Sequence, residues 1–89
     1  MRSQGKKERP KIIDYRLAFG ARVREVRGLA NIGQEALAHQ IDMSRRYLSG
    51  IERGEANPTL DQIVRLADGL GVQPARLLPE RAVPPQAEV

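Results

Sequence analysis

Apolar residues in the first part of the chain recur at the spacing of a helix, and almost no alternating pattern of the kind that predicts a strand is present. Phe19, Val23 and Val26 are spaced i, i+4 and i+7, which places them on one face of a helix. Asp14 precedes them and is a favourable N-cap residue. The pattern therefore predicts a first helix that follows Asp14 and buries one face.

Two shorter helices are predicted in the middle of the chain. Residues 34–41 place their apolar side chains on one face and predict the second helix. Ser44 is a favourable N-cap residue for the third helix, in which Leu48 and Ile51 face inward. Gly54 follows, and glycine adopts the left-handed conformation that ends many helices without a steric penalty.

The clearest amphipathic stretch is residues 60–70, which predicts a fourth helix. Its apolar positions, at i, i+3, i+4, i+7 and i+10, are Leu60, Ile63, Val64, Ala67 and Leu70. Pro74 suits the first turn of a short fifth helix that contains Leu77 and Leu78. We therefore expect an all-α fold of five short helices around one small aliphatic core.

The length of 89 residues supports one domain with two flanking segments. Residues 1–13 are polar and basic and predict a flexible arm, which either only improves solubility or reaches an adjacent DNA minor groove. Residues 14–78 hold the predicted helices and form the expected domain. Residues 79–89 are rich in proline, have no periodic apolar face and predict a flexible tail.

The positive charge of the chain is unevenly distributed. The first 11 residues hold five of the 15 basic residues and one of the 11 acidic residues, so the rest of the chain holds ten of each. The net charge of +4 therefore lies in the predicted arm, and a basic pI alone is weak support for a nucleic-acid partner. Support for such a partner has to come from the positions of individual arginines.

Several functional classes lack their chemical groups in this sequence. The chain has no cysteine and a single histidine, His39, and it has no glycine-rich phosphate loop. We therefore expect no enzyme, no cofactor, no metal site and no small-molecule substrate. No apolar run approaches the roughly 20 residues of a membrane span, and no secretion signal is present, so a cytoplasmic protein without a membrane partner is expected.

The predicted second and third helices are joined by only Asp42 and Met43. So short a link makes two short helices cross steeply, as in a helix-turn-helix unit, whose second helix enters the major groove of DNA. Arg45 and Arg46 lie in the first turn of that helix, where the helix dipole disfavours positive charge by up to about 1 kcal/mol. A bidentate contact with guanine, which contributes about 1 to 3 kcal/mol of discrimination, exceeds this cost. The alternative is that both arginines only keep the helix surface soluble.

The segment "GQEALAHQIDMSRRYLSGIERGEANPTLDQIVRLADGLGVQPARLL" resembles the Cro and phage-repressor type of helix-turn-helix protein, a prokaryotic family also named after the xenobiotic response element repressor. The resemblance depends on a combination of motifs and runs from about Phe19 to Leu78. These motifs are Gln34-Glu35, Leu37-Ala38, Ser44, Glu52-Arg53-Gly54, Asn57-Pro58 and Leu70-Gly71-Val72. It implies a lambda-repressor-like DNA-binding domain with its helix-turn-helix at helices two and three.

The resemblance also implies roles for individual residues. Arg45 and Arg46 would read bases. The DNA backbone would be contacted by Gln34, Ser44, Tyr47, Arg53 and Asn57. Two roles are open for Tyr47, which is either a hydroxyl donor to phosphate or an aromatic lid on the arginines. Ser49 is expected to be solvated, and Gly50 stands where relatives often carry a polar base-reading side chain.

The family pattern further implies a structural ion pair between Arg27, late in the first helix, and Glu52, late in the third. One recognition helix contacts too few base pairs for useful selectivity, so we expect a homodimer on double-stranded DNA with an inverted-repeat operator. The apolar residues expected at the dimer interface are Val72, Leu77 and Leu78, some of which must also serve the core.

The leading hypothesis is thus a sequence-specific regulator of transcription. Small stand-alone members of the family include phage repressors, antitoxins and controller proteins of restriction-modification systems, and the size of this chain favours a controller or a Cro-like switch. The alternative is a protein-interaction module on the same scaffold, such as an antitoxin or a polymerase adaptor, which would bind DNA weakly or not at all.

Overall fold

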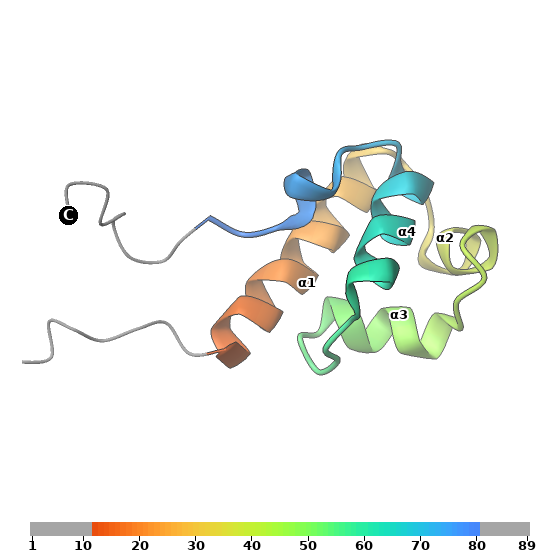
Figure 1. The fold of residues 1–89 in the computed structure, drawn as a ribbon. Coiled ribbons are helices and arrows are strands. Elements are labelled where there is room, and N and C mark those ends of the chain that lie inside the picture. Colours follow the sequence, from red (N-terminus) through yellow and green to blue (C-terminus); the bar gives the residue numbers. More distant parts are fainter. Residues whose placement is uncertain (1–11, 81–89) are drawn as a thin grey trace, which may run out of the picture.

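Four α-helices and one short 3-10 helix make up residues 12–80, the part of the chain that the computed structural model describes (Figure 1). They are α1 (Ile12–Leu29), α2 (Gln34–Gln40), α3 (Arg45–Glu52), α4 (Leu60–Leu70) and the 3-10 helix η2 (Pro74–Leu77). Side chains are described from Tyr15 onward. Residues 1–11 and 81–89, which hold most of the predicted arm and tail, lie outside the described part.

The predictions for the two ends of this fold need correction. The predicted fifth α-helix is the 3-10 helix η2, only four residues long, so the described residues contain four α-helices and not five. Pro74 starts it as predicted, but the chain returns to an extended conformation at Leu78 before a full α-helical turn can follow. At the other end α1 begins at Ile12, so Asp14 lies within its first turn and does not cap it.

One aliphatic cluster fills the space between the helices. Its buried residues are Phe19, Val23, Val26, Leu37, Ala38, Ile41, Leu48, Ile51, Leu66, Ala67, Leu70 and Leu77. The buried faces of α1, α2 and α3 are those that the sequence predicts. Each helix is short, so its stability comes chiefly from this packing and not from its own backbone hydrogen bonds.

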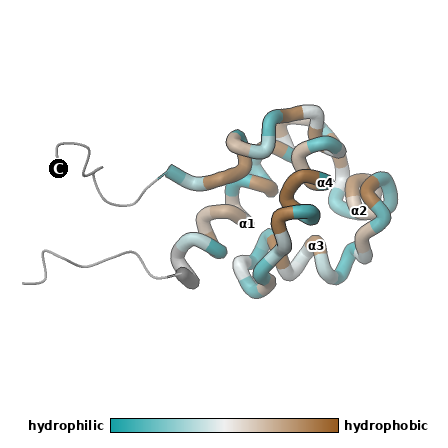
Figure 2. The backbone as a smooth tube through the Cα atoms, in the orientation of Figure 1, coloured by the Kyte–Doolittle hydropathy of each residue, from teal (hydrophilic) through white to brown (hydrophobic). Residues whose placement is uncertain are grey.

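The buried face of α4 differs from the prediction. Leu66 is fully buried, whereas Leu60 and Val64 are 74% and 45% exposed. At about 100° per residue, the apolar residues of α4 cover roughly 160° of the helix, more than the core can bury. The side with Ile63, Leu66, Ala67 and Leu70 packs inward, and Leu60 and Val64 remain exposed. Figure 2 shows the hydrophobic residues that run along α4.

The backbones of α1 and α3 approach each other closely at Gly20. A Cβ atom there would overlap the carbonyl oxygen of Ile51 and lie 2.8 Å from that of Glu52. Gly20 is buried at this crossing, where α1 meets the last turn of α3. The absence of a side chain at this position therefore sets how close the two helices lie.

The link between α2 and α3 spans Ile41–Ser44, so it is one residue longer at each end than the predicted link of Asp42 and Met43. Asp42 has a left-handed backbone with φ of 57°, a conformation that Asp tolerates better than most residues. The Arg65 guanidinium, from α4, donates hydrogen bonds to the carbonyls of Ile41 (2.6 Å) and Asp42 (3.0 Å). These bonds use carbonyls that the end of α2 leaves unpaired, so α4 fixes the turn that orients α3.

None of the helices within residues 12–80 is both long enough and apolar enough to span a bilayer.

Candidate nucleic-acid interface

The first turn of α3 is built by its cap. Ser44 has an extended backbone, and its Oγ accepts a hydrogen bond from the Tyr47 N–H at 3.0 Å. This is the N-cap that the sequence predicts, and it satisfies one of the backbone donors that the start of a helix leaves unpaired. Arg45 and Arg46 follow directly, and both side chains are exposed. Two cationic side chains therefore stand at the positive end of a short, well-capped helix.

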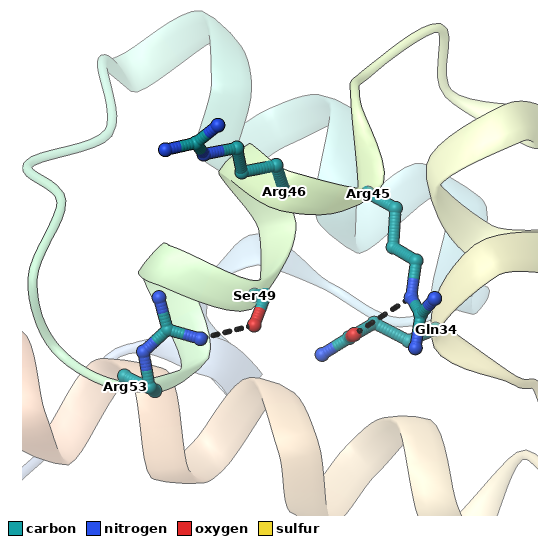
Figure 3. A pocket seen from close by; sticks show the side chains of 5 residues that line it. All are labelled: Gln34, Arg45, Arg46, Ser49 and Arg53. Carbon is teal, nitrogen blue, oxygen red and sulfur yellow. Dashed lines mark hydrogen bonds between the residues drawn. The ribbon is translucent and has the colours of Figure 1, made fainter.

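A shallow hollow of about 280 Å³ lies along the outer face of α3 (Figure 3). It is lined by Gln34 from α2 and by Arg45, Arg46, Ser49 and Arg53. Arg45, Ser49 and Arg53 are spaced i, i+4 and i+8, which places them in one row along the helix. Three guanidinium groups thus surround one open concavity, an arrangement suited to an anionic ligand.

Ser49, which the sequence leaves as a solvated residue, lines this open hollow, and its Oγ accepts a hydrogen bond from Arg53. The i, i+4 spacing between Arg45, Ser49 and Arg53 was the signal that could have identified it. A Cβ atom at Gly50 would meet no atom within 4 Å, so the structure leaves open space one helical turn after Arg46. Ser49 itself is half-buried.

A chain of hydrogen bonds joins the hollow to the body of the domain. The Arg45 Nε donates to the Gln34 Oε1 at 3.4 Å, and the Gln34 Nε2 donates to the Glu52 Oε1 at 3.0 Å. Figure 3 shows Gln34 beside Arg45, whereas Arg46 extends away from both. Within the described residues, the Arg46 guanidinium makes no hydrogen bond or ion pair. The two adjacent arginines are therefore held very differently.

The structure brings Arg27 and Glu52 together in a bidentate ion pair, with Nε–Oε2 at 2.7 Å and Nη2–Oε1 at 3.0 Å. The side chains are only 17% and 5% exposed. The hydrogen bonds that Arg27 donates to Glu52 raise the pKa of Arg27, an effect that burial partly opposes. Arg27 also donates to the Ile32 carbonyl at 3.0 Å, so it ties α1 both to α3 and to the segment that precedes α2.

Arg53, which follows the last turn of α3, is engaged on two sides. Its Nε and Nη2 donate to the two Glu55 carboxylate oxygens at 3.1 and 3.0 Å, and its Nη1 donates to Ser49. The hydrogen bonds from Arg53 lower the pKa of Glu55, and the same contacts raise the pKa of Arg53. Both side chains are more than half exposed, so this pair lies at the protein surface, with Arg53 inside the lining of the hollow and Glu55 outside it.

Tyr47 connects α3 to the start of α4. Its hydroxyl donates to the Gln62 Oε1 at 3.0 Å, and the same oxygen accepts the Thr59 N–H at 2.8 Å. The Gln62 N–H donates in turn to the Thr59 Oγ1, which completes a capping box. In this structure the only proton of the Tyr47 hydroxyl is therefore used within the protein.

Asn57, a predicted backbone-contact residue, does not line the hollow with the arginines. It lines a second hollow, of about 210 Å³, with Tyr15, Arg16, Phe19, Pro58, Ile63, Leu78 and Pro79. This hollow is mostly apolar and shares no residue with the first.

Comparison with known proteins places this geometry in a family. A family model described as a helix-turn-helix domain matches residues 18–79. Control protein C.BamHI of Bacillus amyloliquefaciens is 48% identical over 66 residues, which cover 73% of this chain and 82% of the relative. The chain belongs to the helix-turn-helix family of DNA-binding transcription regulators.

Solved structures of helix-turn-helix proteins share the fold of the chain. The restriction-modification controller protein C.AhdI from Aeromonas hydrophila is 39% identical, with a TM-score of 0.68, and the match covers 70% of this chain and 94% of that one. The hypothetical transcription factor NHTF from Neisseria is 34% identical, with a TM-score of 0.70 and coverage of 91% and 88%. The resemblance to this family that the sequence motifs indicate is thus confirmed, and both matches include most of the related protein.

For this helix-turn-helix chain, the apolar residues expected at a dimer interface are in three different environments. Leu77 has no exposed surface and belongs to the core, because η2 packs it against the other helices. Val72 is half-buried against the same core, and Leu78 is 48% exposed. Only Leu78 of the three offers a largely open side chain, while Leu60 and Val64 on α4 are exposed apolar residues that the sequence assigned to the core.

The described residues contain no group of three or more histidine and carboxylate side chains placed to hold a metal ion.

Proposed function

We propose that α2 and α3 form the helix-turn-helix unit of this regulator and that α3 enters the major groove of its DNA site. Support comes from the short link fixed by Arg65, from the exposed arginines at the start of α3, and from the position of α2 against the base of the same hollow. The carrying observation is that Arg45 and Arg46 stand together on the exposed first turn of a helix that is anchored at its last turn.

The two arginines have different proposed roles. Arg46 has no partner within the described residues, so it can turn toward a guanine edge without breaking a contact. Arg45 is steered by Gln34, whose own amide is fixed by Glu52. We propose that Arg46 provides the stronger base contact and that Gln34 positions Arg45 beside it.

The proposed contacts to the DNA backbone follow the rim of the hollow. Gln34, Ser44 and Arg53 lie close to the arginines, and Asn57 would contact the strand beyond the end of α3. The bond from Tyr47 to Gln62 supports a role in fixing α3 against α4. A phosphate contact by the Tyr47 hydroxyl would first have to break that bond.

We further propose that the protein binds an inverted-repeat operator as a homodimer, as a controller of a restriction-modification system. The relatives named as control proteins support the biological role. The dimer contact would use Leu60, Val64 and Leu78, which are exposed apolar side chains, together with the partly open Val72. A second copy would bury these side chains and place two copies of α3 about one turn of DNA apart, roughly 34 Å.

Selection of bound fragments from random DNA tests the proposed recognition. The wild type should enrich an inverted-repeat consensus, and Arg46→Ala should lose its strongest guanine preference, with a penalty of about 1 to 3 kcal/mol at that position. Arg24→Ala removes the same charge from the exposed surface of α1 and should keep the wild-type consensus. An unchanged guanine preference in Arg46→Ala, or no symmetric consensus for the wild type, would contradict the proposal.

Sedimentation equilibrium tests the proposed dimer. Val64→Lys should shift the chain toward the monomer, because a charge at the centre of an apolar contact must be desolvated. Leu29→Lys changes an apolar side chain on α1 that is 71% exposed, against 45% for Val64, and should leave association unchanged. A wild-type chain that is monomeric at high concentration, or equal effects of the two variants, would place the interface elsewhere.

A further inference from the structure

Glu55 does not line the hollow, but its carboxylate is bound to Arg53, which does. Within the described residues, no other acidic side chain contacts an arginine of the hollow. Its two carboxylate oxygens face the Nε and Nη2 of Arg53, which is the side-on fork that a phosphate would also use. Carboxylate and phosphate are interchangeable partners for this fork. Glu55 therefore stands where a DNA phosphate would bind Arg53.

We propose that Glu55 limits the strength of the contacts with the DNA backbone, because its carboxylate competes with phosphate for Arg53 and so weakens binding to DNA of any sequence. The inference rests on the proposed function, since it requires the hollow to meet DNA. A phosphate that approaches Arg53 must displace the Glu55 carboxylate or bind beside a negative charge, and both reduce its gain. Contacts with phosphate carry no sequence information, so the reduction applies equally to every DNA sequence.

The surroundings of the Arg53–Glu55 pair indicate that the pair can open and let phosphate compete, and is not a permanent structural bond. Both side chains are more than half exposed, and an exposed ion pair is weak enough to open. Ser49 holds the Nη1 side of Arg53, so the guanidinium stays in the hollow when Glu55 leaves. By contrast, Glu52 is almost fully buried against Arg27 and cannot act in this way. The recognition surface thus contains one replaceable carboxylate.

Glu55 acts only on a contact with the DNA backbone, so selectivity between sequences depends on the proposed base contacts at the other end of α3. Arg46 is unaffected by Glu55 in this arrangement, because their side chains lie at opposite ends of the helix and share no contact. Loss of the Glu55 charge should therefore strengthen binding to unrelated DNA and to a specific site by about the same factor.

The test measures affinity for a labelled mixed-sequence duplex of about 30 base pairs, roughly three helical turns, over a series of salt concentrations. Glu55→Gln should bind about twofold to fivefold more tightly than the wild type. The slope of log K against log salt should also become steeper by up to about 0.9, the value for one added phosphate contact. Circular dichroism should show the same helix content for both proteins.

A double-mutant comparison separates competition from simple repulsion. In an Arg53→Ala background, Glu55→Gln should change the affinity by much less than twofold, because the competed group is absent. Asp68 is exposed near the C-terminal end of α4, and Figure 1 shows that this end of the helix is directed away from α3. Asp68→Asn removes one charge there and should leave the affinity for DNA unchanged.

Two results would overturn the inference: no tightening by Glu55→Gln, or equal tightening with and without Arg53. Failure of the wild type itself to bind any duplex would instead remove the proposed function on which the inference rests.

Discussion

The first and last turns of α3 belong to the same short helix, yet the side chains at its two ends are held in opposite ways. At the last turn, Glu52 is almost fully buried in a bidentate pair with Arg27, and Arg53 beside it is held by Glu55 and Ser49. At the first turn, Arg45 has one long hydrogen bond to Gln34, and Arg46 has none within the described residues. The side chains at one end of the helix are held by carboxylates, and the arginines at the other end are left open.

This difference explains how so small a domain can present mobile side chains at a defined angle. The buried ion pair and the close approach at Gly20 set the position of the helix backbone relative to α1. At the open end, Arg46 has no partner within the described residues, so it can adopt the rotamer that the proposed contact with bases needs. A change at the fixed end should therefore alter stability first, whereas a change at the open end should alter DNA recognition with little effect on folding.

Gly20→Ala should cause the largest loss of stability, because the new methyl group lies where α1 crosses the last turn of α3. The added methyl group would overlap the Ile51 carbonyl, and neither backbone can move without disturbing the core. We expect a loss of about 3 kcal/mol in the free energy of unfolding, measured by urea denaturation. Gly28→Ala lies in the same helix with no atom near the new Cβ, and helix propensity should make it neutral or stabilising. Similar stabilities for the two variants would show that the crossing is looser than the structure has it.

Arg27→Met should cause the next largest loss of stability. It leaves the Glu52 carboxylate buried without its main partner, although the Gln34 amide still donates to it. We expect a loss of about 2 to 3 kcal/mol in thermal or chemical unfolding. Arg24→Met makes the same change at an exposed position of α1 and should alter stability by less than about 0.5 kcal/mol. A small effect of Arg27→Met would mean that the last turn of α3 is held mainly by apolar packing.

Substitution of Ser44 should give the smallest effect on stability and sharpen the contrast at the open end. Ser44→Ala removes the cap bond to the Tyr47 N–H and should cost about 1 kcal/mol in unfolding free energy. Ser44→Asp keeps a capping oxygen and should retain stability, yet its charge should weaken DNA binding by repelling phosphate. Equal DNA affinity for Ser44→Asp and the wild type would remove Ser44 from the DNA interface.

Much of this fold could be predicted from sequence because the signals are local. Ser44 caps α3 as expected, and the helical spacing of Phe19, Val23 and Val26 gives the buried face of α1. The ambiguous case was α4, whose apolar residues cover more of the helix than one core contact can bury, so that periodicity could not separate Leu66 from Val64. Only the packing of the other helices makes that choice.

The surface contacts of the site were harder to predict because they join residues from different elements through rotamers. The resemblance to known regulators pointed to Arg27 with Glu52, but nothing local in the sequence places Gln34 between Glu52 and Arg45. The contact from Arg65 to the turn before α3 crosses 23 residues of sequence and has no sequence signal. Glu55 could have been noticed as an acid two residues from Arg53, yet its bidentate geometry depends on the turn at Gly54, where φ is 78°.

The most direct test of the two-ended α3 is to follow the arginine Nε–Hε signals by NMR while a duplex carrying the selected consensus is added. The signals of Arg45 and Arg46 should shift strongly, and that of Arg27 should stay in place because its partner Glu52 remains bound. A shift of Arg27 without a shift of Arg46 would contradict the account, since the open end of the helix would then not be the end that meets DNA.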